Sequence, residues 1–146
     1  MGEATYYILA RCETPTQAEV LLTKFRDLND EGVRAYNWWQ SHRGEPNDKF
    51  WPVFRATFPL VSDYLDHDTP NVTEPSNGLA GLLDFIDEED GQLYAEETDL
   101  CGNGTVWHCA DWGPLTHWLV RHGAVQSVWL SDEDGVDYFD ILKRGL

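Results

Sequence analysis

The pattern of apolar and polar residues is clearest near the N-terminal end, where it predicts a strand followed by a helix. Apolar and polar residues alternate through "ATYYILARC", which is typical of a half-buried strand. Thr14, Pro15 and Gln17 then supply an N-cap, a first-turn proline and a capping box. Apolar residues recur at helical spacing as far as Gly32, which we expect to end the helix. These residues are Ala18, Leu21, Leu22, Phe25 and Leu28.

The segment from Val33 to Asp68 leaves its topology open. "RAYNWWQ" could form a strand or a helix. Pro52 and Pro59 bracket "VFRATF", and this spacing predicts a short strand between the two prolines.

The second half of the chain predicts alternating helices and strands. "HDTPNVTEPSNG" has the composition of a loop, and Leu79, Leu82, Leu83 and Ile86 follow it at the spacing of one buried helix face. "QLYAEET" and "TVWHCA" predict two strands, which we expect to join at Asn103-Gly104 because Asn-Gly favours tight hairpin turns.

The last third predicts one more helix and two strands. Pro114 to His122 has proline in its first turn and Gly123 behind it. "VQSVWL" and "VDYFDIL" are strand-like runs. We therefore predict one α+β domain over residues 1–146, with a mainly antiparallel sheet and about three helices packed on it.

Charge narrows the classes of function. The chain has 26 acidic residues and 10 basic ones, a formal charge of −16, and such a balance repels nucleic acids and anionic membranes. No apolar run approaches the roughly 18 residues of a membrane span, and three scattered cysteines favour a reducing compartment, so we expect a cytoplasmic protein without disulfides. Residues 56–120 contain 13 acids and no Lys or Arg.

Residues that could carry chemistry do not form a known motif. Cys101, His108 and Cys109, with His117 and His122, have ligand types that zinc prefers, but the spacing matches no zinc signature. Both acidic turns, "DEEDG" and "SDEDG", lack the first ligand of a calcium-binding loop. We predict no metal and no cofactor, and no catalytic residue is assigned, since no nucleophile or phosphate-binding motif is present.

The most unusual stretch is "DFIDEEDGQLYAEETDL", which holds eight carboxylates and no base. A protein adapted to high salt would spread its acids evenly, and solubility needs a net charge of only about 2 to 8. An uneven distribution favours a basic partner protein, which such a surface attracts at long range. On one strand, Glu97 and Asp99 would share a face, and Asp84 and Glu88 would lie one turn apart on the preceding helix.

Size and charge together lead to a hypothesis for function. Acidic chains of this length resemble virus-encoded inhibitors of host nucleases, DNA mimics among them, and immunity proteins that neutralise nuclease toxins, although no motif is shared. We expect a non-enzymatic inhibitor of a basic, nucleic-acid-handling protein, without direct binding to nucleic acid or membrane. The alternative is a small enzyme or small-molecule-binding domain. The candidate partner-binding residues are Asp84, Asp87, Glu88, Glu89, Asp90, Glu96, Glu97 and Asp99, with Trp38 and Trp39 as aromatic anchors.

Overall fold

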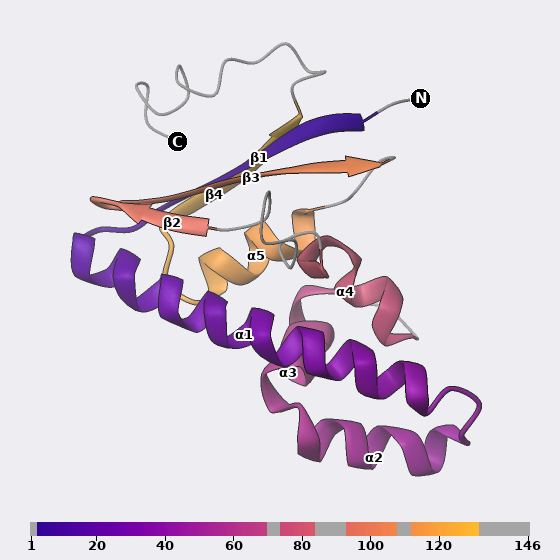
Figure 1. The fold of residues 1–146 in the computed structure, drawn as a ribbon. Coiled ribbons are helices and arrows are strands. Elements are labelled where there is room, and N and C mark those ends of the chain that lie inside the picture. Colours follow the sequence, from indigo (N-terminus) through magenta and orange to yellow (C-terminus); the bar gives the residue numbers. More distant parts are fainter. Residues whose placement is uncertain (1–2, 70–73, 84–92, 108–111, 132–146) are drawn as a thin grey trace.

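The computed structural model describes residues 3–69, 74–83, 93–107 and 112–131 (Figure 1). The elements follow in the order β1 (Glu3–Arg11), α1 (Pro15–Ser41), α2 (Asn47–Thr57), α3 (Pro59–Asp68), α4 (Pro75–Leu83), β2 (Leu93–Glu96), β3 (Asp99–Trp107), α5 (Gly113–Arg121) and β4 (Gln126–Ser131). The predicted α+β class with an antiparallel sheet is confirmed, and the described part has five helices because residues 33–68 are largely helical.

The sheet has the strand order β2-β3-β1-β4, and every pairing is antiparallel. β1 is an interior strand: Ile8 lies opposite Gly102 of β3 and Trp129 of β4. The helices lie on one side of the sheet, with α1 and α5 against it and α2 farthest away (Figure 1). The core lies between these layers, where Ile8 and Ala10 pack with the apolar face of α1.

The start of α1 agrees with the prediction, but its end does not. Thr14 accepts a hydrogen bond from the Gln17 backbone N–H at 3.1 Å, and the Gln17 side chain accepts one from the Glu13 N–H at 3.2 Å. The helix then continues through Gly32 to Ser41. Gly32 does not adopt the left-handed conformation of a helix stop. A Cβ there would lie 3.2 Å from Leu82, so glycine lets α4 approach closely.

The strand predicted between Pro52 and Pro59 is wrong. Residues 47–57 form α2, with Pro52 inside the helix, and Pro59 begins α3. Phe50, Phe54 and Phe58 recur at four-residue spacing and are all buried. This apolar face outweighs the hydrogen bond that proline cannot donate.

The start of α3 is fixed by a tertiary contact. Buried Glu31 of α1 accepts a hydrogen bond at 2.6 Å from the backbone N–H of Val61, in the first turn of α3. A carboxylate at a helix N-terminus satisfies a free N–H and interacts favourably with the helix dipole. The predicted helix near Pro114 is confirmed as α5, and Gly123 behind it has φ 137°.

The predicted hairpin turn at Asn103-Gly104 is also wrong. Both residues lie inside β3, opposite Tyr7 and Tyr6 of β1, and the turn is at Glu97-Thr98. β3 runs beside the whole of β1, and this pairing overrides the local turn preference. Glu97 and Asp99 therefore do not share a strand face, because Glu97 is in the turn.

The strand "VQSVWL" is confirmed as β4, whereas "VDYFDIL" and Ile86 lie outside the described residues. Leu79 and Leu82 are fully buried on α4, as their spacing predicts. Within the described ranges, every helix is too short or too polar to cross a lipid bilayer.

Candidate functional site

The tip of the β2–β3 hairpin carries part of the predicted acidic surface. We call residues Glu96 to Asp99 the acidic hairpin. Glu96 and Glu97 are exposed. The backbone of Glu97 has φ 55°, a left-handed conformation that residues other than glycine and asparagine rarely adopt. The turn thus holds a glutamate where the backbone favours glycine.

Asp99 differs from its neighbours because it has a countercharge. Arg11 lies opposite it in the β1–β3 register, and Arg11 Nε and Nη2 donate to Asp99 Oδ1 and Oδ2 at 2.7 and 3.1 Å. This hydrogen bonding raises the pKa of Arg11 against the opposing effect of its desolvation. Glu96 and Glu97 have no ion pair within the described ranges. In the acidic hairpin, Arg11 therefore neutralises Asp99, whereas the charges of Glu96 and Glu97 are not compensated within the described ranges.

Five of the predicted partner-binding acids lie outside the described residues. They are Asp84, Asp87, Glu88, Glu89 and Asp90. Their assignment stays a prediction from sequence.

The two candidate tryptophans are consecutive on α1 and both are half-buried. Trp38 packs among phenylalanines, with its ring centroid 5.2 Å from Phe50 and 5.9 Å from Phe58, and it stacks on His42 at 3.8 Å. The Arg43 guanidinium lies 5.0 Å over the Trp39 ring. Both tryptophans thus pack against the core while part of each side chain remains accessible.

An ion-pair cluster between α3 and α5 was not predicted. Its centre is Asp68, whose side chain has 0% exposure. Arg121 Nη2 donates to Asp68 Oδ2 at 2.7 Å and to Asp63 Oδ2 at 2.6 Å, and His117 Nδ1 lies 2.6 Å from Asp68 Oδ1. His122 Nε2 lies 3.5 Å from Asp63 Oδ2, too far for a strong hydrogen bond. We call these residues the Asp68 cluster.

Charges in this cluster shift several pKa values. Burial alone would raise the pKa of Asp63, but hydrogen bonding and attraction to Arg121 outweigh it, so the pKa is lowered. Burial, aided by repulsion from Arg121, lowers the pKa of His122 in spite of the nearby Asp63 carboxylate. Hydrogen bonding to Asp68 raises the pKa of Arg121 above its ordinary value. Arg121 therefore keeps its positive charge, which favours the ionised form of Asp63 and the neutral form of His122.

The contact between Asp68 and His117 has a geometry that chemistry can use. A buried carboxylate that accepts from Nδ1 fixes the tautomer and leaves Nε2 as an acceptor. The His117 side chain is 60% exposed. Such a pair can remove a proton from water or a substrate. No signal along the chain indicates it, because Asp68 and His117 are far apart in sequence.

The predicted metal ligands are not brought together in the described part. Cys101 is buried in β3, opposite Leu9 of β1 and Tyr94 of β2, whereas His117 and His122 contact the α3 carboxylates. His108 and Cys109 lie outside the described residues. Across the described ranges, no three His, Cys, Asp or Glu side chains form a group that could hold a metal ion.

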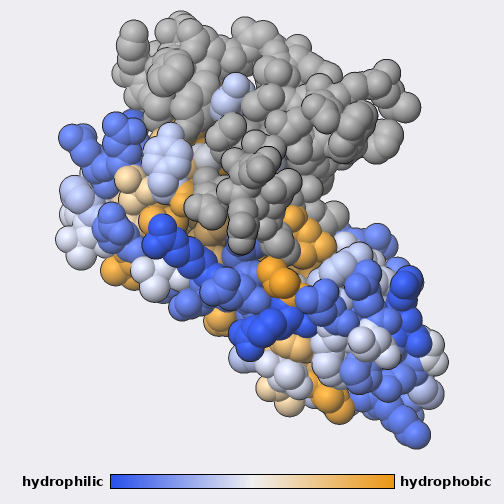
Figure 2. All heavy atoms as spheres, in the orientation of Figure 1, coloured by the Kyte–Doolittle hydropathy of each residue, from blue (hydrophilic) through white to orange (hydrophobic). Residues whose placement is uncertain are grey.

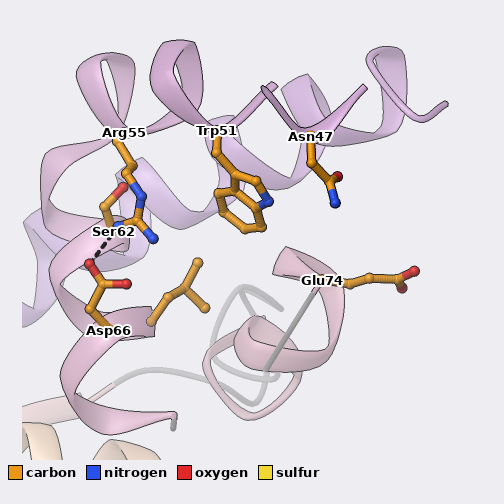
Figure 3. Close-up of a pocket in the computed structure, with 7 residues that line it drawn as sticks. Asn47, Trp51, Arg55, Ser62, Asp66 and Glu74 are labelled. Carbon is orange, nitrogen blue, oxygen red and sulfur yellow. Dashed lines mark hydrogen bonds and ion pairs between the residues drawn. The ribbon is translucent and has the colours of Figure 1, made fainter. Parts of the chain in front are cut away.

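Two adjoining cavities lie beside α2, one toward α3 and the other toward the end of α1, and both reach the start of α4. The larger has a volume of about 470 Å³ and is lined by Asn47, Trp51, Arg55, Ser62, Leu65, Asp66 and Glu74 (Figure 3). The second, of about 230 Å³, shares Asn47, Trp51 and Glu74 with it and extends to Trp39 and Arg43. Trp51 is conspicuous in the sequence among basic residues, but nothing in the sequence places Ser62 or Glu74 beside it.

Searches against protein-family models, curated proteins and solved structures found no match to this chain.

Proposed function

We propose that this protein is a non-enzymatic inhibitor that binds a basic, nucleic-acid-handling protein through a surface that includes the acidic hairpin. The observation that carries the proposal is that some acids of residues 56–120, the segment without Lys or Arg, have no countercharge. Arginines from other segments neutralise Asp63, Asp66, Asp68 and Asp99. Three further acids, Glu74, Glu96 and Glu97, have no ion pair within the described ranges.

The backbone at Glu97 supports a role for its side chain. A non-glycine residue in the left-handed region costs about 1 kcal/mol or more, and strained residues cluster at functional positions. Stability alone would favour glycine at this turn. A glutamate at the exposed tip adds negative charge where a partner can approach.

The rest of the surface favours recognition through charge. On the face shown in Figure 2, hydrophilic side chains cover most of the described helices, and hydrophobic patches are small and separate. Large exposed apolar residues are spread over several elements, among them Val20 on α1, Val53 on α2 and Leu60 on α3. A net charge of −16 attracts a basic protein at long range and competes for a groove that holds phosphates.

The experiment begins with affinity capture from the native host on the immobilised protein, with identification of the captured protein. We expect the captured protein to be basic, and we expect duplex DNA or RNA to displace it from the immobilised protein. Binding rates are then measured by surface plasmon resonance at low and high salt. Screening acts beyond about 8 Å at physiological ionic strength, so association should slow steeply as salt rises.

Two fourfold variants test the surface. The first replaces Glu88, Glu89, Glu96 and Glu97 by Gln, and we expect its association rate to fall about tenfold. The matched control makes the same charge change on exposed positions of α1 and the residue before its N-cap, with Glu13→Gln, Glu19→Gln, Asp27→Asn and Asp30→Asn. Equal effects of the two variants would mean that only net charge matters, and the proposed surface would be wrong.

A second candidate, a small enzyme, is favoured by the Asp68–His117 pair. Within the described part, no Ser, Thr or Cys side chain is hydrogen-bonded to His117, so water is the nucleophile that this imidazole would activate. A panel of chromogenic phosphodiesters and esters tests this candidate. Hydrolysis that the His117→Gln substitution removes, without loss of fold, would establish it over the inhibitor.

A further inference from the structure

The larger cavity, between α2 and α3, is a slot with apolar walls and polar ends. Trp51 projects from α2 into the space, between Arg55 with Asp66 at one end and Asn47 with Glu74 at the other (Figure 3). Leu65 of α3 contributes the opposite apolar wall. The volume of about 470 Å³ lies within the range of about 300 to 1,000 Å³ that is usual for ligand sites.

One polar group in the slot lacks a partner. Ser62 is only 7% exposed, and its Oγ has no hydrogen-bond partner within the described ranges. A serine on a helix commonly donates to the carbonyl four residues earlier, but the Ser62 hydroxyl makes no such bond to the Phe58 carbonyl. A buried hydroxyl without a partner is unfavourable, so Ser62 is a polar residue in the wall of the slot that stability alone does not explain.

The charges of the slot select the sign of its ligand. Arg55 is paired with Asp66 and also lies over the Trp51 ring, so its charge is compensated. Glu74 is exposed and has no ion pair within the described ranges. One guanidinium and two carboxylates leave the slot negative, in a chain of net charge −16. The field therefore attracts cations and repels anions.

We propose that this slot holds an arginine side chain of the basic partner protein, an inference that rests on the proposed function. The alkyl stem would pack between Trp51 and Leu65, and the guanidinium would reach Glu74. Arginine fits better than lysine, because a planar guanidinium binds a carboxylate through two parallel hydrogen bonds, whereas an ammonium is a point charge.

The second cavity indicates that the arginine belongs to a polypeptide. It shares Asn47, Trp51 and Glu74 with the slot and continues to Trp39 at the end of α1. A free small cation would fill the slot alone, whereas a chain segment can place neighbouring atoms in both cavities. The predicted anchor Trp39 would then contact the residue next to the arginine.

The binding test uses defined probes and the indole N–H signals of a ¹⁵N-labelled sample. The probes are the peptide Gly-Arg-Gly-Arg-Gly, the same peptide with lysine or glutamate at both arginine positions, and free acetyl-arginine amide. We expect the arginine peptide to shift the Trp51 and Trp39 signals and to bind at least fivefold more tightly than the lysine peptide or the free amide. The glutamate peptide should shift neither. Equal affinity for the free amide, or for lysine, would overturn the assignment to a partner arginine.

Substitutions locate the site. Glu74→Gln alters an exposed side chain, and we expect it to weaken the affinity for the arginine peptide at least fivefold. Asp27→Asn, the same loss of charge on the exposed face of α1, should change affinity less than twofold. A fold check by circular dichroism accompanies each variant. Equal effects of Glu74→Gln and Asp27→Asn would overturn the proposal that the arginine peptide binds in the slot.

Measurements with the captured partner separate this inference from the proposed function. If the partner binds Glu74→Gln as it binds the wild type, while the hairpin substitutions weaken it, the slot is wrong and the inhibitor proposal stands. If the arginine peptide fills the slot but no basic partner is captured, the inhibitor proposal is wrong, and so is the assignment of the slot to a partner side chain.

Discussion

Replacing Asp68 by Asn tests whether the Asp68 cluster holds α3 and α5 together. The substitution keeps the size of a fully buried side chain and removes the charge that faces Arg121 and His117. Hydrogen bonds to charged groups contribute about 1.5 to 3 kcal/mol each, without simple additivity, and breaking a buried ion pair costs about 3 to 5 kcal/mol. Asn retains one acceptor and Arg121 retains Asp63, so we expect a loss of about 3 kcal/mol.

The same helix offers a matched control. Asp66 also pairs with an arginine, Arg55, but its side chain is 45% exposed. Exposed pairs contribute about 1 kcal/mol or less, so Asp66→Asn should change stability by no more than that. Urea unfolding followed by circular dichroism gives both free energies of unfolding. In thermal melts, we expect Asp68→Asn to lower Tm by about 6 to 12 °C.

A double-mutant cycle identifies the partner. Asp68→Asn and Arg121→Met should together cost less than the sum of the single substitutions, with a coupling of about 1.5 kcal/mol or more. If the Asp66 and Asp68 variants lose the same stability within about 0.5 kcal/mol, burial does not set the strength of these pairs. In that case, our reading of the Asp68 cluster is wrong.

Two further predictions concern single positions. Glu97→Gly should raise the free energy of unfolding in urea by about 0.5 to 1 kcal/mol, because glycine removes the left-handed strain but gains chain entropy when unfolded, whereas Glu97→Gln should leave it unchanged. His122 has a lowered pKa, so the unfolded chain takes up its proton first, and wild-type stability should fall as pH drops below about 6.5. His122→Gln should lose less stability than wild type between pH 6.5 and 5. Asp63 does not obscure this window, because a carboxylate with a lowered pKa loses its contribution only below about pH 4.

Elements of the fold with strong local signals could be predicted from the sequence. Thr14 begins α1, Gly123 follows α5, and alternation identifies β1. The errors arise where distant contacts decide the structure. Gly32 looks like a helix stop, but its role is to admit Leu82, which is 50 residues away. Asn103-Gly104 looks like a turn, but pairing with β1 extends the strand through it.

The candidate site was less predictable for the same reason. Sequence alone shows that residues 84–99 are acidic, but it does not show that Asp99 is neutralised by Arg11, a residue 88 positions earlier. The Asp68 cluster joins helices whose charged residues are 53 positions apart. The slot needs Trp51, Ser62 and Glu74 from three different segments. Each depends on chain topology, which no local spacing encodes.

The interior position of β1 has a consequence for biosynthesis. Ile8 pairs with Trp129, so β1, the first strand of this sheet in chain order, waits for a partner made 121 residues later. At about 5 to 20 residues per second, that delay is roughly 6 to 24 s, far longer than a helix needs to form. During this time, α1, α2 and α3 can pack on one another, while the apolar "YYILA" has only β3 to pair with once it emerges. Newly made chains therefore expose one unpaired edge of this hydrophobic strand until β4 is complete, and their yield should depend on chaperones that protect it.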